Sequence, residues 1–516
     1  MAVDEREMLL GVAGHCSDFL AGLGTRPVAP TTGLAELRHR LALATPEVGL
    51  AEERVIAELI EGADGGLMGS AGGRFFGWVI GGSLPGALAA DWLTSTWDQN
   101  AALYSCSPAV AVIEETCGRW VKELLGLPAS ASFGIVTGGQ MAHVTALAAA
   151  RHDLLTRCGV DVEAEGLSGA PPLRVLTTGA RHGSIERAVR FLGLGSGSIV
   201  EVPAGQTGAI RVEALEEALA ASGDPTIVVL QAGDINTGLF DPFAEAVPLA
   251  HSHGAWVHVD GAFGLWAATS DHHRGLLRGV EAADSWATDA HKWLNVPYDC
   301  GIAIVAHPAA HRAAMTSRAS YLVHSEDDAR DQIDWNPDWS RRGRAVSLYA
   351  AIRTLGRRGI AEIVERTSRH AGALVRGIGG LPGVEVLSGA HLNQGLVRFL
   401  DTAGDHDRRT DAIIGSIQAE GTAWFGGTTW HGMRAMRISV CNWRTTEEDV
   451  RLTVDAVARV LEVSAASGPT ESSTTGPVRA RGLEVRSAPR AGYRAQPEPR
   501  VDEDNPDALV RIEPWT

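Results

Sequence analysis

The chain has 516 residues, of which 45% are apolar and 21% charged, as in a globular protein too long for a single hydrophobic core. Its 45 lysines and arginines are outnumbered by 62 aspartates and glutamates, and the net charge of −17 argues against binding to nucleic acid or anionic membranes. The six cysteines form no CxxC pair, the N-terminus lacks a basic signal-peptide region and no apolar run is long enough to span a bilayer, so we expect a cytoplasmic protein without disulfides or a metal site.

Helical patterns broken by glycine and proline predict an N-terminal helical extension over residues 1–70. From 71 to 315, short β-branched runs alternate with helical patterns, which predicts an α/β domain around a large, mostly parallel sheet. The predicted strands are 173–178, 198–203, 226–231, 256–259 and 302–307. The predicted helices between strands are 139–152, 184–193 and 212–222.

A second unit, residues 316–464, begins with a loop and a helical pattern near 341–358 and continues as a small α+β domain. Its predicted strands are 384–387, 396–400 and 436–441, and its predicted helices are 406–419 and 446–462. Residues 465–516 are rich in Ser, Thr, Gly, Pro and Arg with few apolar residues, which predicts a tail without a stable fold of its own.

Only two of the 45 basic residues are lysines, Lys122 and Lys292. Because arginine serves wherever a positive charge suffices, a retained lysine is a candidate nucleophile, a role that arginine cannot fill. Lys122 lies in the helical pattern RWVKELLG, where a solvated surface role is expected. Lys292 lies in the loop sequence ATDAHKWLNVPYDCG and is the better candidate.

Polar residues follow several predicted strands. Asp260 comes directly after the strand 256–259, at the strand end where open α/β sheets bind ligands. Its carboxylate could pair with a protonated heterocyclic nitrogen, or it could cap the next helix. An aspartate at a strand end followed by a loop lysine such as Lys292 is the spacing that a site for pyridoxal 5'-phosphate (PLP) needs.

Three further loops lead to the same edge of the sheet. Gly139 and Gln140 open a helix after an apolar run, and the free amides of a helix N-terminus suit a phosphate. His182 follows the strand 173–178, and Thr237 lies in the loop after the strand 226–231. Each signal is weak alone, but their convergence on one edge predicts a single site.

The segments HVDGAFG, TDAHKW and NTGLFDP resemble the group II PLP-dependent amino-acid decarboxylases, which include the aromatic-amino-acid and glutamate decarboxylases. The resemblance extends from about residue 73 to 450. It implies a PLP-dependent transferase-like fold of the aspartate aminotransferase type I class, and a homodimer.

The resemblance also implies roles for single residues. Lys292 would form a Schiff base with PLP and Asp260 would pair with the pyridine nitrogen, while His182 and Ala262 would lie at the two faces of the ring. Residues implied near the rest of the cofactor are Gly139, Gln140, Thr237 and His291. Asp289 stands where relatives can have an amide, and because phosphate would repel a carboxylate, its role stays open.

The implied reaction is decarboxylation of an L-amino acid through the Lys292 Schiff base and a quinonoid intermediate. The family places a catalytic tyrosine on a mobile loop, but here Trp335 or Ala329 stands near its position, while Tyr321 matches an earlier, non-catalytic tyrosine. His324 could donate the proton instead. Without the hydroxyl, an oxidative deaminase that yields an aldehyde is an alternative, as are another carbon–carbon lyase such as an aldolase and a cofactor-binding scaffold.

Three residues are candidates for contact with the substrate side chain or carboxylate. Phe76 and Trp78 lie in a region that resembles the family's side-chain pocket, where aromatic rings would favour an apolar or aromatic substrate; both could equally be core residues. Arg437 aligns roughly with an arginine of the C-terminal domain that can reach an anionic group. A surface or interdomain ion pair is the alternative for Arg437.

Overall fold

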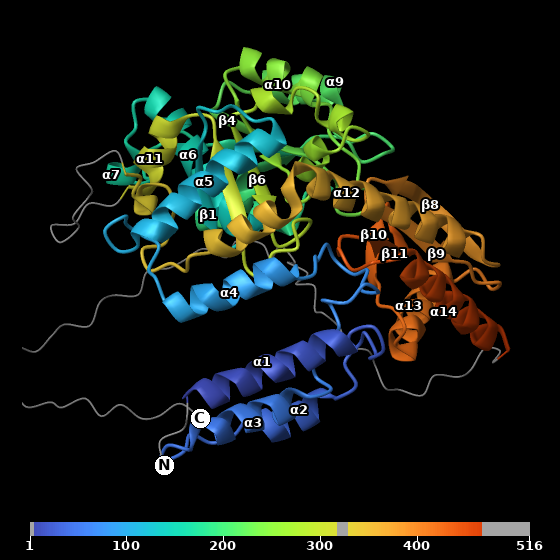
Figure 1. The fold of residues 1–516 in the computed structure, drawn as a ribbon. Coiled ribbons are helices and arrows are strands. Elements are labelled where there is room, and N and C mark those ends of the chain that lie inside the picture. Colours follow the sequence, from blue (N-terminus) through green and yellow to red (C-terminus); the bar gives the residue numbers. More distant parts are fainter. Residues whose placement is uncertain (1–4, 317–328, 467–516) are drawn as a thin grey trace, which may run out of the picture. The chain divides into compact units, whose positions relative to one another are not determined.

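The computed structural model describes residues 5–316 and 329–466 (Figure 1). Two sheets organise it, one of seven strands and one of four. The predicted α/β class, with a large sheet and a smaller C-terminal α+β part, is confirmed. Tyr321 and His324 lie outside the described residues, as does the predicted tail beyond Ala466.

The large sheet has the strand order β1-β7-β6-β5-β4-β2-β3. Its strands are β1 Ser132–Val136, β2 Arg174–Thr177, β3 Ile199–Glu201, β4 Thr226–Gln231, β5 Trp256–Asp260, β6 Ser285–Asp289 and β7 Gly301–Val305. All pairs are parallel except those that β7 makes with β1 and β6. Every residue of β1, β4, β5, β6 and β7 is buried, as expected for a sheet covered on both faces.

The strands predicted at 173–178, 198–203, 226–231 and 256–259 are β2 to β5. The strand predicted at 302–307 is β7, which lies inside the sheet between β1 and β6. No prediction covered β6, because Ser285, Thr288 and Asp289 interrupt its apolar pattern.

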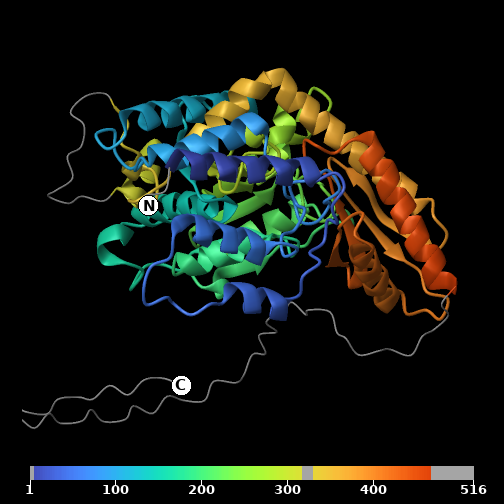
Figure 2. The ribbon, with the colours of Figure 1, turned by 60° about the horizontal axis from the view of Figure 1, so that its bottom comes forward.

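Helices cover both faces of the large sheet (Figure 2). One hydrophobic cluster joins the sheet to α6 Gly139–Arg157, α8 Gly183–Phe191 and α11 Pro308–Met315. A second cluster joins the other face to α5 Pro108–Leu125, α9 Val212–Ala220, α10 Phe243–Ser252 and part of α12. Short helices complete this part: α7 Val162–Glu165 and 3-10 turns at Ser196–Ser198, Gly264–Thr269, Arg274–Leu277, Val280–Ala282 and Gln332–Asp334.

The small sheet is antiparallel, with the order β10-β11-β9-β8. Its strands are β8 Val384–His391, β9 Gln394–Phe399, β10 Gly426–Trp430 and β11 Met433–Ser439. It packs against α13 His406–Glu420, α14 Glu447–Ala466 and the second half of α12. The glycine-rich sequence of β10, GGTTW, explains why no strand is predicted there.

Helix α12, Ala345–Gly379, links the two sheets and extends well beyond the predicted 341–358. Its first half packs with the large-sheet core and its second half with the small-sheet core. The helix is interrupted at Gly356, where φ is 58° and ψ is 178°. A positive φ of this kind favours glycine.

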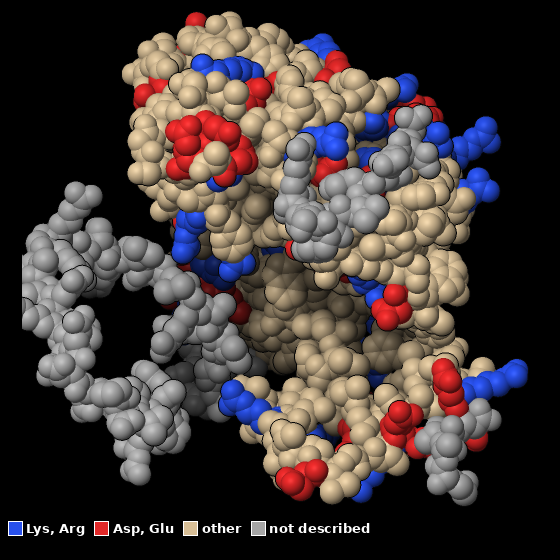
Figure 3. Space-filling view, turned by 90° about the vertical axis from the view of Figure 1, so that its left-hand side faces the viewer, with Lys and Arg blue, Asp and Glu red and all other residues tan. Residues whose placement is uncertain are grey.

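The N-terminal part contributes α1 Glu5–Gly22, α2 Leu34–Leu41 and α3 Glu52–Ala63, followed by α4 Pro85–Trp97. Within α1 to α3 the only buried residue is Gly62. Large apolar side chains are instead exposed, including Leu9, Leu10, Leu34, Leu59 and Trp97. Figure 3 shows that this side of the molecule is hollowed and that the floor of the hollow carries few charged side chains. In the part of the chain that the structure describes, no helix is long and apolar enough to cross a membrane.

Candidate active site

The carboxyl ends of three large-sheet strands bring the candidate residues together. Asp260 is the last residue of β5, Asp289 is the last residue of β6, and Lys292 follows three residues later. Strand β1 leads to Gly139, the first residue of α6. This is the edge at which an open α/β sheet binds ligands, and the sequence predicted it.

Lys292 forms an ion pair with Asp289, with 3.1 Å between Nζ and Oδ2. Asp289 is only 2% exposed, and its other oxygen has no hydrogen-bond partner among the described residues. The sequence left this carboxylate without a role, and the structure gives it an attractive partner in Lys292. Lys122 is different: its Nζ donates to the carbonyls of Ala129 and Ala131 at 2.7 and 2.5 Å, so it closes a turn rather than standing free in solvent.

Asp260 is buried with spare capacity to accept hydrogen bonds. Its Oδ1 accepts the Ala262 amide at 3.2 Å, and its Oδ2 lies 3.6 Å from Nε2 of His143. Burial alone would raise the pKa of Asp260, but interactions with His143, His182 and Lys292 hold it below its ordinary value. The group is therefore a carboxylate at neutral pH, able to face a cation.

His182 is the N-cap of α8 and is exposed. Its Nδ1 accepts the Ser184 amide at 3.2 Å and lies 2.7 Å from the Ser184 hydroxyl. The remaining nitrogen, Nε2, therefore carries the proton. Partial burial lowers the pKa of His182, so the ring is neutral at neutral pH. Gln140 is tied to the same turn, because its Nε2 donates to the Ser184 carbonyl at 3.2 Å.

The start of α6 lies directly against Asp289 and His291. A Cβ atom on Gly139 would lie 2.9 Å from Asp289 Oδ2, and one on Gly138 would lie 3.2 Å from the His291 ring. His291 accepts the Cys300 amide at Nδ1, at 3.2 Å, and its ring lies on Tyr298 with 4.5 Å between centroids. Glycine is required here because the backbone approaches the site so closely.

The lysine loop is held by a segment that the sequence did not connect to it. A Cβ atom on Gly81 would lie 2.0 Å from the Lys292 carbonyl oxygen. Asn295 accepts the Gly82 amide at Oδ1 and the Leu84 amide at its backbone oxygen, at 2.5 and 2.9 Å. Residues 81–84 are therefore packed onto the lysine loop.

The two aromatic candidates of this segment separate in the structure. Phe76 is 0% exposed and stacks on Phe425 in the small-sheet core, which agrees with the alternative that it is a core residue. Trp78 is 51% exposed, has a φ of 46° and stacks on Trp424 at 4.8 Å. Of the two aromatic side chains, Trp78 is therefore the accessible one.

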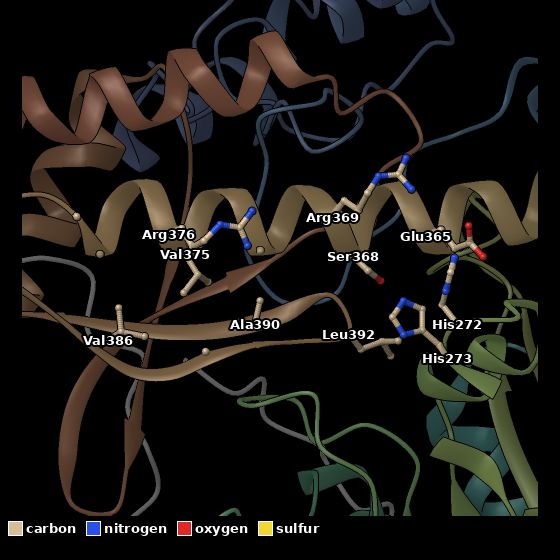
Figure 4. Close-up of a pocket in the computed structure, with 14 residues that line it drawn as sticks. His272, His273, Glu365, Ser368, Arg369, Val375, Arg376, Val386, Ala390 and Leu392 are labelled. Carbon is tan, nitrogen blue, oxygen red and sulfur yellow. The ribbon is translucent and has the colours of Figure 1, made fainter. Parts of the chain in front are cut away.

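A cavity of about 760 Å³ adjoins the site and is lined by His182, Asn236 and Arg437. Arg437 is 7% exposed and donates to the Ile235 carbonyl at 3.3 Å, so it is not a surface ion pair. The hydroxyl of Thr237 donates to Asp234 at 2.9 Å, which commits this hydrogen to the loop rather than to a ligand. A second cavity, about 890 Å³, lies between α12 and β8 (Figure 4), and no predicted site residue lines it.

The residues present fit the three recognisable parts of PLP. Lys292 is an amine for the aldehyde, and Asp260 is a buried carboxylate for the ring nitrogen. The first amides of α6, at Gly139 and Gln140, have no carbonyl partner within the helix and suit the phosphate. The Asp289 carboxylate is the one group in the set that does not favour a phosphate.

Comparison with known proteins points in the same direction. Residues 38–400 match the family model described as "Pyridoxal-dependent decarboxylase conserved domain". L-2,4-diaminobutyrate decarboxylase of Rhizobium meliloti is 30% identical over 391 residues, covering 73% of this chain and 76% of the relative. Aromatic-L-amino-acid decarboxylase of Bacillus atrophaeus is 25% identical over 464 residues, covering 87% and 94%.

Among solved structures, Oryza sativa TDC with PLP and tryptamine superimposes with a TM-score of 0.84 at 23% identity, covering 90% of this chain and 99% of that one. Rhodiola rosea 4-hydroxyphenylacetaldehyde synthase gives a TM-score of 0.79 at 22% identity, covering 91% and 100%. At these identities, the two structures establish the fold alone.

Proposed function

We propose, from the premise that this chain belongs to the pyridoxal-dependent decarboxylase family, that it releases CO2 from an L-amino acid with Lys292 as the residue that holds PLP. Family membership gives the reaction class and the cofactor. The observation that supports the residue assignment is the cluster of Lys292, Asp289, Asp260 and His182 at one edge of the large sheet. Lys122, the other lysine of the chain, is tied to a turn after α5.

The chain's own groups have distinct tasks in this proposal. PLP, when bound, draws electrons from the bond that breaks at the substrate's α-carbon. Lys292 supplies the amine that attaches the cofactor and can accept or return a proton close to that carbon. Asp260 keeps a proton on the ring nitrogen, because a buried carboxylate stabilises a facing cation. His182, neutral and held by Ser184, covers the ring and presents its Nε2–H.

We propose that the substrate enters the cavity lined by His182, Asn236 and Arg437. Burial lowers the pKa of Arg437 to about 10, so the guanidinium is still charged at neutral pH and can attract a carboxylate. Trp78, with half of its ring exposed, would favour a substrate with an apolar or aromatic side chain. Known relatives act on diamino, aromatic and acidic amino acids, so all three classes belong in a substrate screen.

The test combines product analysis with cofactor labelling. The purified holoenzyme is supplied with the three substrate classes, and released CO2, amine and hydrogen peroxide are measured. CO2 with amine is expected; aldehyde with peroxide would instead identify the oxidative alternative. Borohydride reduction followed by peptide mass spectrometry should place the pyridoxyl group on Lys292, and a label on Lys122 would overturn the assignment.

We further propose a cytoplasmic homodimer in which α1 to α3 pack on a second copy of the chain. The support is that exposed leucines on these helices, such as Leu10 at 63% and Leu34 at 62%, are unusual for a surface that stays in water. The free state of all six cysteines is consistent with a reducing compartment. Analytical ultracentrifugation should give a dimer for the full chain and a weaker dimer for Leu10→Asp/Leu34→Asp, and an active monomeric wild type would contradict the proposal.

A further inference from the structure

A row of polar groups lies behind Asp260. Trp256, His258 and Asp260 occupy alternate positions of β5, so their side chains point to the same face of the sheet. His143 of α6 lies against this row: its ring contacts that of His258 edge-on, with 5.2 Å between centroids. Trp256 and His143 are 1% exposed and His258 is 0% exposed, so these three side chains are shielded from solvent, while Asp260 at the end of the row is 8% exposed.

Hydrogen bonds connect the row from end to end. Trp256 Nε1 donates to the Ser285 hydroxyl at 2.9 Å, and that hydroxyl lies 2.9 Å from His258 Nδ1. His258 Nε2 then lies 2.9 Å from His143 Nδ1. His143 Nε2 lies 3.6 Å from Asp260 Oδ2, which is too long for a hydrogen bond but close enough for an N–H dipole to act on a carboxylate.

The direction of the first bonds follows from what each group can donate. An indole nitrogen is a donor only, so the Ser285 oxygen must be the acceptor of the Trp256 bond. The Ser285 hydroxyl has no other side-chain partner among the described residues. Its single hydrogen must therefore go to His258 Nδ1, because a buried hydroxyl rarely leaves its hydrogen unpaired. His258 is thereby an acceptor at Nδ1.

The remaining bonds follow from the charge of the two histidines. Burial lowers the pKa of His258 to about 3, and burial also lowers the pKa of His143, so each ring carries one proton at neutral pH. With Nδ1 of His258 accepting, its proton is on Nε2 and is donated to Nδ1 of His143. The proton of His143 must then be on Nε2, directed at Asp260.

We infer that Trp256, Ser285, His258 and His143 form a one-way hydrogen-bond chain that presents an N–H to Asp260 and so keeps the proton of the facing cofactor on its ring nitrogen. This inference rests on the proposed function. His143 is a positioning residue, since it acts on the cofactor only through Asp260. Without its N–H, the Asp260 carboxylate is less stabilised, and the shared proton moves from the ring nitrogen towards the Asp260 oxygen.

The experiment is nitrogen NMR of the holoenzyme loaded with PLP carrying 15N in the ring. The 15N chemical shift reports directly whether the ring nitrogen is protonated. In His143→Leu the signal should move towards the value of unprotonated pyridine, and kcat should fall about 10-fold to 100-fold with little change in KM, as is common when an outer-shell partner of a charged ligand is lost. In His143→Gln, the side-chain amide can donate to Asp260, and the signal should return towards that of the wild type.

His311 provides a matched control. It is also 0% exposed, its Nδ1 lies 2.9 Å from the hydroxyl of Ser132, and its Nε2 bonds the Trp335 carbonyl at 3.1 Å. His311→Leu therefore removes a buried histidine with a serine partner, far along the chain from Asp260. It should lower the melting temperature without moving the 15N signal.

The outcomes separate the two proposals. A wild-type holoenzyme that binds no PLP at Lys292 or releases no CO2 would overturn the proposed function, whereas a wild type that does both with an unprotonated ring nitrogen would overturn the hydrogen-bond chain. A normal wild type with an unchanged signal in His143→Leu would overturn the hydrogen-bond chain alone. If His143→Leu does not fold, Ser285→Ala takes its place. Without the Ser285 hydroxyl, the proton of His258 is no longer confined to Nε2. A shift of the 15N signal towards that of unprotonated pyridine then supports the hydrogen-bond chain, and an unchanged signal refutes it.

Discussion

An aspartate with histidines nearby stands at each end of strand β6, but the two carboxylates differ in how many hydrogen bonds they accept. Asp284 stands directly before the strand, and its Oδ2 accepts the Val257 amide at 2.7 Å and His251 Nε2 at 2.9 Å. Its Oδ1 accepts His307 Nε2 at 2.8 Å. Both oxygens of this aspartate are thus occupied by groups of the protein itself.

At the carboxyl end, Asp289 leaves one oxygen without a hydrogen bond among the described residues, and neighbouring Asp260 holds only the Ala262 amide at hydrogen-bonding distance. Each also lies near a histidine, His291 or His143, at a longer distance of 3.7 or 3.6 Å. The Asp284 cluster satisfies its own carboxylate, whereas Asp289 and Asp260 keep acceptors free, which is the condition that a ligand with hydrogen-bond donors or a positive charge requires.

The sharpest test of this difference is Asp260→Asn, which preserves shape and removes charge. We expect turnover to fall by about 10²–10³-fold, as when one preorganised electrostatic contact at a reacting centre is lost, while PLP still binds. Steady-state CO2 release and the visible absorbance of the bound cofactor measure the two effects. Turnover near that of the wild type would show that Asp260 only caps the turn that follows β5.

Asp284→Asn is the matched change at the other end of the sheet. It should lower the free energy of unfolding by about 1–3 kcal/mol, since three donors lose a charged acceptor. Turnover should stay within about twofold, because such effects are local. Urea unfolding of the holoenzyme measures the loss. A large fall in turnover with unchanged stability would reverse the contrast between the two ends.

The same cluster predicts a pH dependence of stability. Hydrogen bonds to Asp284 lower its pKa although burial would raise it. Its contribution to the free energy of unfolding is therefore present above pH 3.8, the ordinary pKa, and is lost as the pH falls through the lowered pKa. The hydrogen bond between His307 and Asp284 raises the pKa of His307 above the ordinary 6.5. The contribution of His307 to the free energy of unfolding is therefore present below pH 6.5 and is lost as the pH rises through the raised pKa. Stability from this pair is greatest between these limits. Unfolding midpoints at pH 5.5 and pH 8 should differ less in His307→Gln than in the wild type.

The smallest expected effect is that of His251→Gln. The His251 side chain is 39% exposed, so its bond to Asp284 is exchanged with water bonds on unfolding. We expect a loss of about 0.5 kcal/mol or less, as for exposed polar pairs. A loss of unfolding free energy as large as that of Asp284→Asn would mean that the bond from His251 accounts for most of the stabilisation by this cluster.

Sequence patterns predicted the features that depend on local chemistry. The continuous β-branched run of β4 fixed its bounds, and the spacing of Asp260 and Lys292 indicated the site before any fold was known. The position of Phe76 could not be predicted, because the sequence alone does not say which core an aromatic side chain enters. His143 was missed because it is a single polar ring between Ala142 and Val144 in α6, and only its hydrogen bond to His258 of β5 shows its importance.

The break at Gly356 has a geometric consequence for the site. The part of α12 beyond it, up to Gly379, is roughly 35 Å long at 1.5 Å per residue. The first turns beyond Gly356 still pack in the large-sheet core through Ile360, Ile363 and Val364, and the later turns pack on the small sheet, whose strand β11 carries Arg437. One pair of backbone dihedral angles thus sets the direction in which α12 leaves the large-sheet core for the small sheet, and so the side of the cavity on which Arg437 stands.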